Sequence, residues 1–346
     1  MHERALRKVL LIQSIEETDR GGAALPLAER IEATRSALGK NPPPPETQSE
    51  APLSTASEWF LIRRADVLLG ALRSRSPGID RVLKLAGGAT PFDRGALLGA
   101  FLLGVALSFL DRGRGIDIFA LPLVVLILWN FLVYVALLRR APPRQTWFAR
   151  FYARSARRHF ENLVAHSSHF NAPLVPGLSR FAGDWWNVAQ PLFAARARRL
   201  SHLGAVLVAV GLIAGYYIRA EILRTDAGWY GGNFLGPDTS HVLLTLLYGP
   251  ALMLSGIDAP STEVIRQLRW TSAQVGGGEA TFWIHLMAWT AGIYIVIPRL
   301  LAVLGSTFTL WRLSRQFVPP PGLTSYVRNV LAVERYPTGN GELNDV

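Results

Sequence analysis

The chain has no cysteine, and among its 346 residues there are only three methionines and three lysines. The lack of cysteine excludes disulfides, thiolate catalysis and metal or cluster sites held by cysteine. The N-terminus carries a charge every few residues and has neither an apolar core nor a small-residue cleavage site, so it does not resemble a secretory signal. We therefore expect the first 90 or so residues to begin and to remain in the cytoplasm.

Common catalytic signatures are also missing. The sequence has no P-loop pattern and no Gly-x-Ser-x-Gly elbow, and Gly276 to Gly278 before Glu279 is expected to be a flexible loop. His159, His166 and His169 are spaced so that they could meet on one helix, but no acidic residue shares their face. The sequence thus predicts no catalytic residue, no metal site and no cofactor.

What the chain does have is long apolar segments. Half of its residues are apolar, and the stretch 116–138 contains one charge, at its second position, before Arg139 and Arg140. A core this apolar, closed by a cationic flank, is typical of a membrane-spanning helix whose C-terminal end faces the cytoplasm. The predicted fold class is an all-α polytopic membrane protein with about four transmembrane helices. The predicted spans are 95–110, 116–138, 203–218 and 281–304.

The distribution of charge predicts the orientation. Residues 139–202 carry 11 arginines against two acidic residues, whereas residues 219–280 carry four arginines against six acidic residues. The positive-inside rule then places 139–202 and both termini in the cytoplasm, and 219–280 outside. One segment leaves an alternative open: 242–254 is apolar but short and is interrupted by Gly249-Pro250, which favours an interfacial or re-entrant helix over a fifth crossing. A fifth crossing would move the C-terminus outside.

These signals divide the chain into segments. Four prolines at 42–45 predict an extended linker, and apolar residues at helical spacing on either side of it predict a helical cytoplasmic N-terminal region. We expect residues 1–90 to be separable from the spans, because the proline run would hold the first part of this region at arm's length. The predicted segments are a cytoplasmic helical segment (1–40), a proline-rich linker (41–56), a second cytoplasmic helical segment (57–94), a transmembrane hairpin (95–138), a basic cytoplasmic loop with an amphipathic helix (139–202), the third and fourth spans with an extracytoplasmic loop at 219–280 (203–304), and a cytoplasmic tail (305–346).

The basic loop contains a predicted amphipathic helix at 147–169. Its arginines Arg150, Arg154, Arg157 and Arg158 share one narrow sector, and aromatic residues, Tyr152 among them, lie roughly opposite. Such a helix either lies on the anionic cytoplasmic leaflet through its arginines or packs its aromatic face on the N-terminal region. No base-stacking or base-reading motif accompanies the arginines, so we expect membrane lipids and not nucleic acid as the partner.

Two further groups of residues are candidate sites. Arg219, Glu221, Asp226 and Trp229 follow the third span and form a candidate extracytoplasmic ligand or partner site, although anchoring at the membrane surface is the favoured interpretation. Within the spans, Asn130 and His285 are polar. We expect both to form hydrogen bonds between helices, because a transport path normally has more ionisable groups at mid-depth.

Four stretches carry a family resemblance. They are VLLIQSIEETD at 9–19, FLIRRA at 60–65, RAEILRTDAGW at 219–229 followed by NFL at 233–235, and YIVIPRL at 294–300. The chain resembles, over nearly its whole length, a bacterial inner-membrane family defined as a domain of unknown function, whose genes often lie beside a gene for an Era-like small GTPase. The resemblance implies no catalytic residue. It does imply a cytosolic GTPase as a partner.

The leading functional hypothesis is a non-enzymatic, multi-pass bacterial inner-membrane protein that anchors or receives a cytosolic partner, such as that GTPase. The alternative is a small channel or transporter subunit with a pore between the spans, for which Asn130, His285 and the Gly249-Pro250 break are the support. A hydrated cleft that reaches His285 would favour the alternative, and a packed aliphatic interior would count against it. The sequence gives no oligomeric state.

Overall fold

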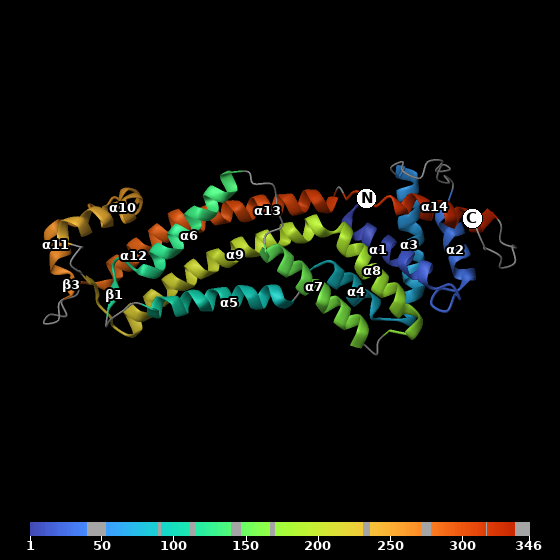
Figure 1. Ribbon diagram of the computed structural model, residues 1–346, viewed down its shortest axis with the longest axis horizontal. Helices are drawn as coiled ribbons and strands as arrows, with labels where there is room; N and C mark the ends of the chain where they lie inside the picture. The colour runs from blue at the N-terminus through green and yellow to red at the C-terminus, as the bar shows by residue number, and fades with distance from the viewer. Residues whose placement is uncertain are drawn as a thin grey trace. The chain divides into compact units, whose positions relative to one another are not determined.

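The computed structural model describes residues 1–39, 53–88, 91–110, 115–139, 147–166, 170–230, 236–270, 278–315 and 317–335. Over these residues the structure is all-helical, as the sequence predicts, apart from three very short strands (Figure 1). It divides into two compact units. We call Met1–Thr90, Trp147–Ala197 and Phe308–Val346 the helical unit, and Pro91–Thr146 and Arg198–Thr307 the apolar unit.

The helical unit joins three stretches that are far apart in the sequence. It contains α1 (Glu3–Thr18), α2 (Leu27–Leu38), α3 (Thr55–Arg75), α4 (Ile79–Ala86), α7 (Trp147–His166), α8 (Val175–Val188) and α14 (Gly322–Arg335), together with the start of α9 and the end of α13. The predicted N-terminal region, basic loop and C-terminal tail are therefore parts of one folded body and not separate segments.

Helix α1 is the core of the helical unit. Its apolar residues recur at helical spacing, and Leu6, Leu11 and Ile15 are completely buried where α1 packs on α3, α4 and α8. Gly177 of α8 lets that helix approach closely, because a Cβ there would lie 2.7 Å from the Cα of Ile15. The N-terminal segment is therefore not held at arm's length by the proline run: its first helix is the centre of the fold. Most of the predicted linker, residues 40–52, lies outside the described residues.

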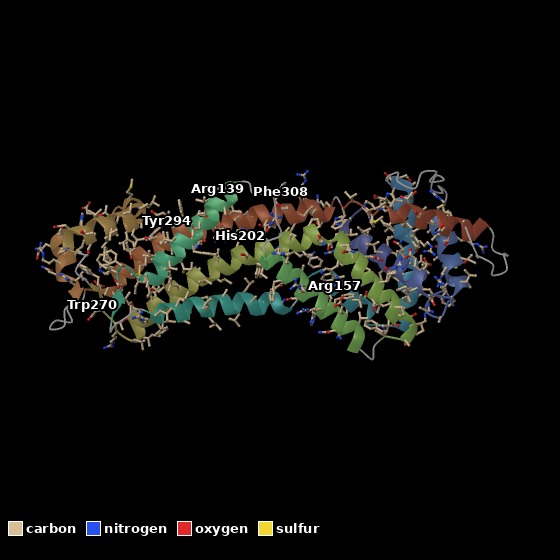
Figure 2. All side chains as sticks on the ribbon, viewed as in Figure 1. Arg139, Arg157, His202, Trp270, Tyr294 and Phe308 are labelled. Carbon is tan, nitrogen blue, oxygen red and sulfur yellow. The ribbon has the colours of Figure 1, made fainter. Side chains whose placement is uncertain are left out.

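The apolar unit contains the candidate spans. Its elements are α5 (Pro91–Leu107) with a 3₁₀ turn at Ser108–Leu110, β1 (Ile116–Asp117), α6 (Leu121–Leu138), α9 (Gln190–Tyr217) with a π-helical turn at Ile218–Ile222, β2 (Ala227–Tyr230), α10 (Pro237–Ser255), α11 (Thr262–Gln267), β3 (Arg269–Trp270), α12 (Ala280–Ala291) with a π-helical turn at Gly292–Val296, and α13 (Ile297–Arg315). Its side chains along α5 and α6 are mostly carbon, whereas nitrogen and oxygen atoms crowd the helical unit (Figure 2).

Within the part of the chain that the structure describes, three helices are long and apolar enough to cross a membrane: Asp93–Leu110, Gln190–Ile222 and Ala280–Arg315. They correspond to the first, third and fourth predicted spans. The apolar helix at Leu121–Leu137 is shorter. Residues 116–120 of the second predicted span are not helical, because Ile116 and Asp117 form β1 and Ala120 has a positive φ of 27°.

Glycines let α5 and α9 pack against each other. A Cβ at Gly104 would strike the backbone of Val208 and Leu212, and one at Gly211 would strike the carbonyl oxygen of Phe101. In a membrane, where water does not drive helices together, such close backbone contact is a main source of association. The α5–α9 pair therefore depends on residues without side chains at these positions.

The predicted extracytoplasmic loop 219–280 is largely folded. Strands β1, β2 and β3 form a small parallel sheet in that order, and Trp229 of β2 is completely buried, with its indole N–H donating to the carbonyl of Ile265 at 2.8 Å. Helix α10 covers the stretch 242–254 and has Pro250 inside it. It buries Leu244 and Tyr248 but exposes Leu246 and Met253, so its outer face is apolar as well.

Gly104→Leu should separate α5 from α9, because the added side chain has no space beside the α9 backbone. We expect a loss of about 1–3 kcal/mol or more of folding free energy, as for other overpacked sites. Gly99→Leu on the same helix is the matched control, since nothing lies within 4 Å of a Cβ at Gly99. Thermal unfolding of the two purified variants in detergent checks this, and equal melting temperatures would contradict the packing described above.

Candidate functional site

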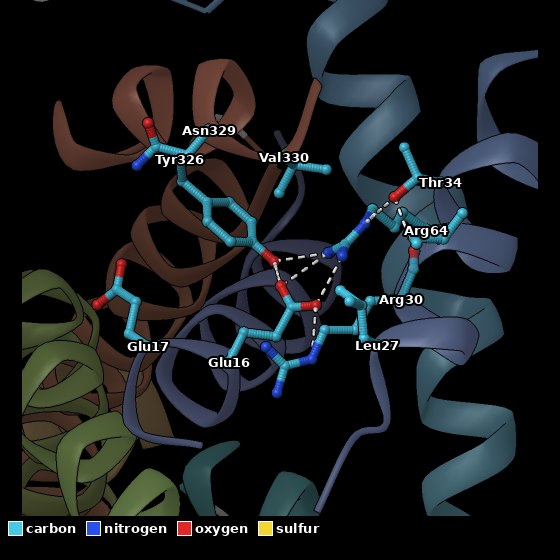
Figure 3. A pocket seen from close by; sticks show the side chains of 10 residues that line it. Glu16, Glu17, Leu27, Arg30, Thr34, Arg64, Tyr326, Asn329 and Val330 are labelled. Carbon is cyan, nitrogen blue, oxygen red and sulfur yellow. Dashed lines mark hydrogen bonds and ion pairs between the residues drawn. The ribbon is translucent and has the colours of Figure 1, made fainter. Parts of the chain in front are cut away.

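A cluster of buried polar residues joins four helices of the helical unit (Figure 3). Arg64 of α3 is 3% exposed and donates to both carboxylate oxygens of Glu16 on α1, at 2.6 and 2.9 Å. Its remaining donors reach the hydroxyl of Thr34 on α2 at 2.9 Å and that of Tyr326 on α14 at 2.7 Å. The bidentate pairing is the strong form of an ion pair and fixes the orientation of both groups.

Tyr326 completes this cluster. Its hydroxyl donates to Glu16 while it accepts from Arg64. Burial raises the pKa of the Tyr326 phenol well above its ordinary value, and the neighbouring Glu16 adds to this shift. The phenol therefore stays protonated as a donor, and α14 is held to α1 and α3 through it.

A second carboxylate closes the loop between α1 and α2. Asp19 accepts from the backbone N–H groups of Ala23, Ala24 and Leu25, at 2.8 to 3.0 Å, and from Arg30 at 2.9 Å. Burial raises the pKa of Asp19, but the backbone hydrogen bonds and Arg30 outweigh it, so the pKa lies below its ordinary value. The carboxylate thus remains ionised and stabilises the turn across the ordinary pH range.

A pocket of about 210 Å³ opens over the Arg64 cluster. Its floor is polar, and Leu27, which is 55% exposed, lies on its lining with Ile31 and Val330. At its floor, Arg64, Glu16 and Tyr326 already bind one another. They form a structural cross-link between helices beneath a surface depression.

The apolar unit has its own buried arginine. Arg299 of α13 is 3% exposed, and its Nε donates to the side-chain oxygen of Asn130 on α6 at 2.6 Å. One of its terminal nitrogens lies 2.9 Å from Nδ1 of His202 on α9, and its guanidinium carbon lies 5.7 Å from the centre of the Tyr134 ring. Because a guanidinium only donates, Nδ1 of His202 must be the acceptor and carries no proton.

The partners of Arg299 are all neutral. Within the described part of the chain no carboxylate lies within ion-pair distance of it. Asn130 thus forms the hydrogen bond between helices that its sequence position predicts. Sequence reasoning missed His202 and Arg299 because His202 ends an arginine-rich loop and Arg299 follows a proline near the end of a span, where a charge is ordinary.

His285 behaves differently from Asn130. Its Nδ1 lies 2.7 Å from the carbonyl oxygen of Thr281 in its own helix, and its ring packs edge-on against Tyr217. The side chain is exposed on the surface of the apolar unit. The predicted hydrogen bond from His285 to another helix is therefore not formed, and the residue does not line the packed interior.

The four residues of the candidate extracytoplasmic site have different surroundings. Arg219 is 5% exposed and donates to the backbone carbonyls of Ser108 and of Gly115, the latter at 2.7 Å. Trp229 is buried, whereas Glu221 and Asp226 are exposed. Arg219 therefore joins the end of α5 to the sheet, and the structure gives both buried residues of the set a backbone partner.

The predicted amphipathic helix is α7, and its arginine face is open. Arg150, Arg154, Arg157 and Arg158 are all exposed, and Arg157 pairs with Glu161 one turn later at 2.7 Å. The opposite face packs on α8 and α4, with Tyr152 donating to the carbonyl of Gly88 at 3.2 Å. The buried stripe consists of Ala149, Tyr152, Ala156, Phe160 and Val164.

The helical wheel that places Tyr152 opposite the arginines places His159 there as well. Tyr152 is buried, but His159 is exposed, because the buried sector is centred on the small residue Ala156. Small residues such as alanine contribute little to a hydropathy pattern, so the buried face was predicted from the aromatic residues instead. No group of three metal-ligating side chains occurs among the described residues; His169 lies outside them, as does the side chain of His166.

Comparisons with protein-family models, with curated proteins and with solved structures gave no match. Function must therefore be inferred from the sites themselves.

Asn130→Leu should destabilise the apolar unit, because it leaves the Nε of Arg299 buried without an acceptor. The expected loss is about 1–2 kcal/mol, since hydrogen bonds between membrane helices are weaker in net terms than their burial implies. Phe131→Leu is the control, because Phe131 is the next residue of the same helix and its side chain is 62% exposed. Thermal unfolding in detergent measures both; a melting temperature of Asn130→Leu no lower than that of the control would contradict a stabilising role.

Proposed function

We propose that this chain is a non-enzymatic bacterial inner-membrane protein with four crossings and both termini in the cytoplasm. Its helical unit acts as a docking platform that recruits a cytosolic partner to the membrane. The observation that carries the proposal is the composition of the helical unit, which collects the chain before the first span, the basic loop and the chain after the last span into one body.

A single compact body lies on one side of a membrane, so the number of crossings between its parts must be even. Between Thr90 and Trp147 the chain has α5 and α6. If α5 crosses, α6 must cross back, even though it is the shorter helix. At 1.5 Å per residue its 18 residues reach about 27 Å, close to the roughly 30 Å of a bilayer core.

The same reasoning disfavours a fifth crossing by α10. Phe317, beyond the last span, accepts a hydrogen bond from the N-terminal amine of Met1 and stacks on Trp185 of α8, with ring centres 5.8 Å apart. A crossing by α10 would place Phe317 and Trp185 on opposite sides of the membrane. The apolar outer face of α10 then fits a helix that lies at the outer surface or re-enters it.

Two faces of the helical unit are open to partners. The arginine face of α7 suits anionic lipid, because each arginine near such a surface contributes on the order of 1 kcal/mol. On α3, Trp59 is 60% exposed and Val67 is 42% exposed, on a helix whose other side is buried. Exposed tryptophan is the residue type most enriched at the centres of protein interfaces, so we assign the protein partner to the α3 face. The family resemblance makes an Era-like GTPase the first partner to test.

The channel or transporter alternative has less support. The interior of the apolar unit is filled by aliphatic and aromatic side chains, such as Leu123, Leu212 and Tyr216, all completely buried. His285 faces outward, and Asn130 is bound to Arg299. A polar path through the unit would need groups that are free to exchange partners with a substrate.

The topology can be tested with single cysteines introduced into the cysteine-free chain. We expect cysteine at Arg157 and at Val318 to react with an impermeant reagent only after the inner membrane is opened, and cysteine at Asp258 to react in intact spheroplasts. Arg157, Asp258 and Val318 are all exposed, Val318 at 80%, so reactivity reports the side of the membrane and not burial. Labelling of position 318 from the outside would favour five crossings instead.

The docking face can be tested with Trp59→Ser in the full-length protein held in nanodiscs. The variant should weaken the Kd for the partner GTPase at least tenfold, as expected for loss of an interface anchor worth about 2 kcal/mol. Phe151→Ser, an exposed aromatic of α7, is the control and should leave the Kd unchanged. Binding measured with GDP and with a GTP analogue shows whether the nucleotide state matters, and no binding in either state would remove the GTPase from the proposal.

A further inference from the structure

Two arginines of the helical unit share a single buried carboxylate. Glu3, at the start of α1, is 6% exposed and lies 3.0 Å from Nη2 of Arg196 and 3.7 Å from Nη2 of Arg7. The side chains of Arg7 and Arg196 are 11% and 18% exposed. The group therefore carries an excess of one positive charge in a largely buried place.

Both guanidiniums also have a buried donor without a partner. Arg7 uses one terminal nitrogen to donate to the carbonyl of Leu83 at 2.6 Å, but its Nε binds nothing. Arg196 binds Glu3 through Nη2, and its Nη1 binds nothing. Buried donors are nearly always satisfied in proteins, by a protein group, a water molecule or an ion, so these two call for an occupant.

The backbone beside the arginines is glycine. A Cβ at Gly87 would strike Nη1 of Arg7, and one at Gly88 would strike the unpartnered Nη1 of Arg196. Gly88 also has a φ of +74°, which glycine adopts without strain. The guanidiniums thus lie directly on a stretch of backbone where a side chain would displace them.

We propose that Arg7 and Arg196, which pack on the Gly87-Gly88 backbone, form an anion site that takes a phosphate monoanion, such as the phosphodiester of a phospholipid headgroup. The guanidinium groups are the donors, because the N–H groups of Gly87 and Gly88 already donate to carbonyls of α4. The single excess positive charge matches a phosphodiester, and guanidinium N–H groups are the donors that bind phosphate oxygens best. Burial lowers the pKa of Arg7, with Glu3 opposing the shift and Arg196 and Arg4 adding to it, which agrees with an incompletely neutralised charge.

The position along the chain favours a lipid as the source of the phosphate. Arg196 lies on α9 seven residues before Leu203, about 10 Å along the helix from the start of the predicted third span. Gly88 lies three residues before α5, which carries the first span. This choice of source rests on the proposed topology, whereas binding of phosphate at the two arginines does not.

The full-length protein, purified in a maltoside detergent and freed of lipid, is titrated with short-chain phosphatidylglycerol and separately with inorganic phosphate, and unfolding temperature is followed. We expect phosphatidylglycerol to raise the melting temperature, because a ligand that binds only the folded state stabilises it. Arg196→Gln should weaken the Kd for it at least about tenfold. Arg180→Gln on α8 is the control, since that arginine already pairs with Glu17 and Asp184.

A second variant keeps the test decisive if Arg196→Gln folds poorly. Glu3→Gln removes the competing carboxylate and should tighten phosphate binding, so unchanged or weaker binding would overturn the site. Equal stabilisation of wild type and Arg196→Gln, or no stabilisation by either probe, would overturn it as well and leave water as the occupant.

Stabilisation by inorganic phosphate as strong as that by the lipid would keep the site but make free phosphate its ligand. Trp59-dependent partner binding is measured separately, so either proposal can fail alone.

Discussion

The packing of α1 against α3, α4 and α8 is the constraint on which the rest of the chain's organisation depends. It joins residues from two of the three stretches of the helical unit, 1–90 and 147–197, into one core around Leu6, Leu11 and Ile15. The hydrogen bond from Tyr326 to Glu16 attaches the third stretch. Under the proposed topology, the helices between these stretches leave and return in pairs, because the stretches belong to one body. The length of α6 and the apolar outer face of α10, each ambiguous by itself, then have a consistent interpretation.

Buried arginines connect helices in both units, and the groups that accept their hydrogen bonds differ from one arginine to the next. Arg64 faces a carboxylate and two hydroxyl groups, so its charge is neutralised and all three of its nitrogen atoms donate hydrogen bonds. Arg299 has only neutral partners, and Arg219 donates to backbone carbonyls at the end of α5. Removal of a single partner in such clusters leaves an uncompensated buried charge, which costs far more than the net worth of the intact interaction. The clusters therefore fix the helices that they connect.

The sequence allowed the helices and the apolar spans to be predicted because both follow from local periodicity and composition. The first, third and fourth spans agree with α5, α9 and α12–α13, and Asn130 forms the hydrogen bond between helices that was expected. The start of α6 was wrong by five residues, because Ile116 pairs with Ala227 of a distant strand, and no local pattern carries that information. The central role of α1 was missed for the same reason: its partners α3, α4 and α8 come from elsewhere in the chain.

The sites were harder to predict than the fold, because the sequence does not show which charged residues the fold buries. With 33 arginines in the chain, Arg64, Arg196 and Arg299 look no different from those on the open face of α7. They differ in the partners that the fold places beside them. Arg64 pairs with a carboxylate, and Arg299 binds neutral groups. Arg196 shares one carboxylate, that of Glu3, with Arg7. Among the described residues, no N–H donor of Arg64 or Arg299 is left buried without a partner, whereas Nε of Arg7 and Nη1 of Arg196 are. Buried donors without a partner, next to an excess of positive charge, are what an anion can use. The distinction makes the Arg7–Arg196 pair, and not the more conspicuous arginine row on α7, the place in this chain where a specific anionic group would be bound and not merely attracted.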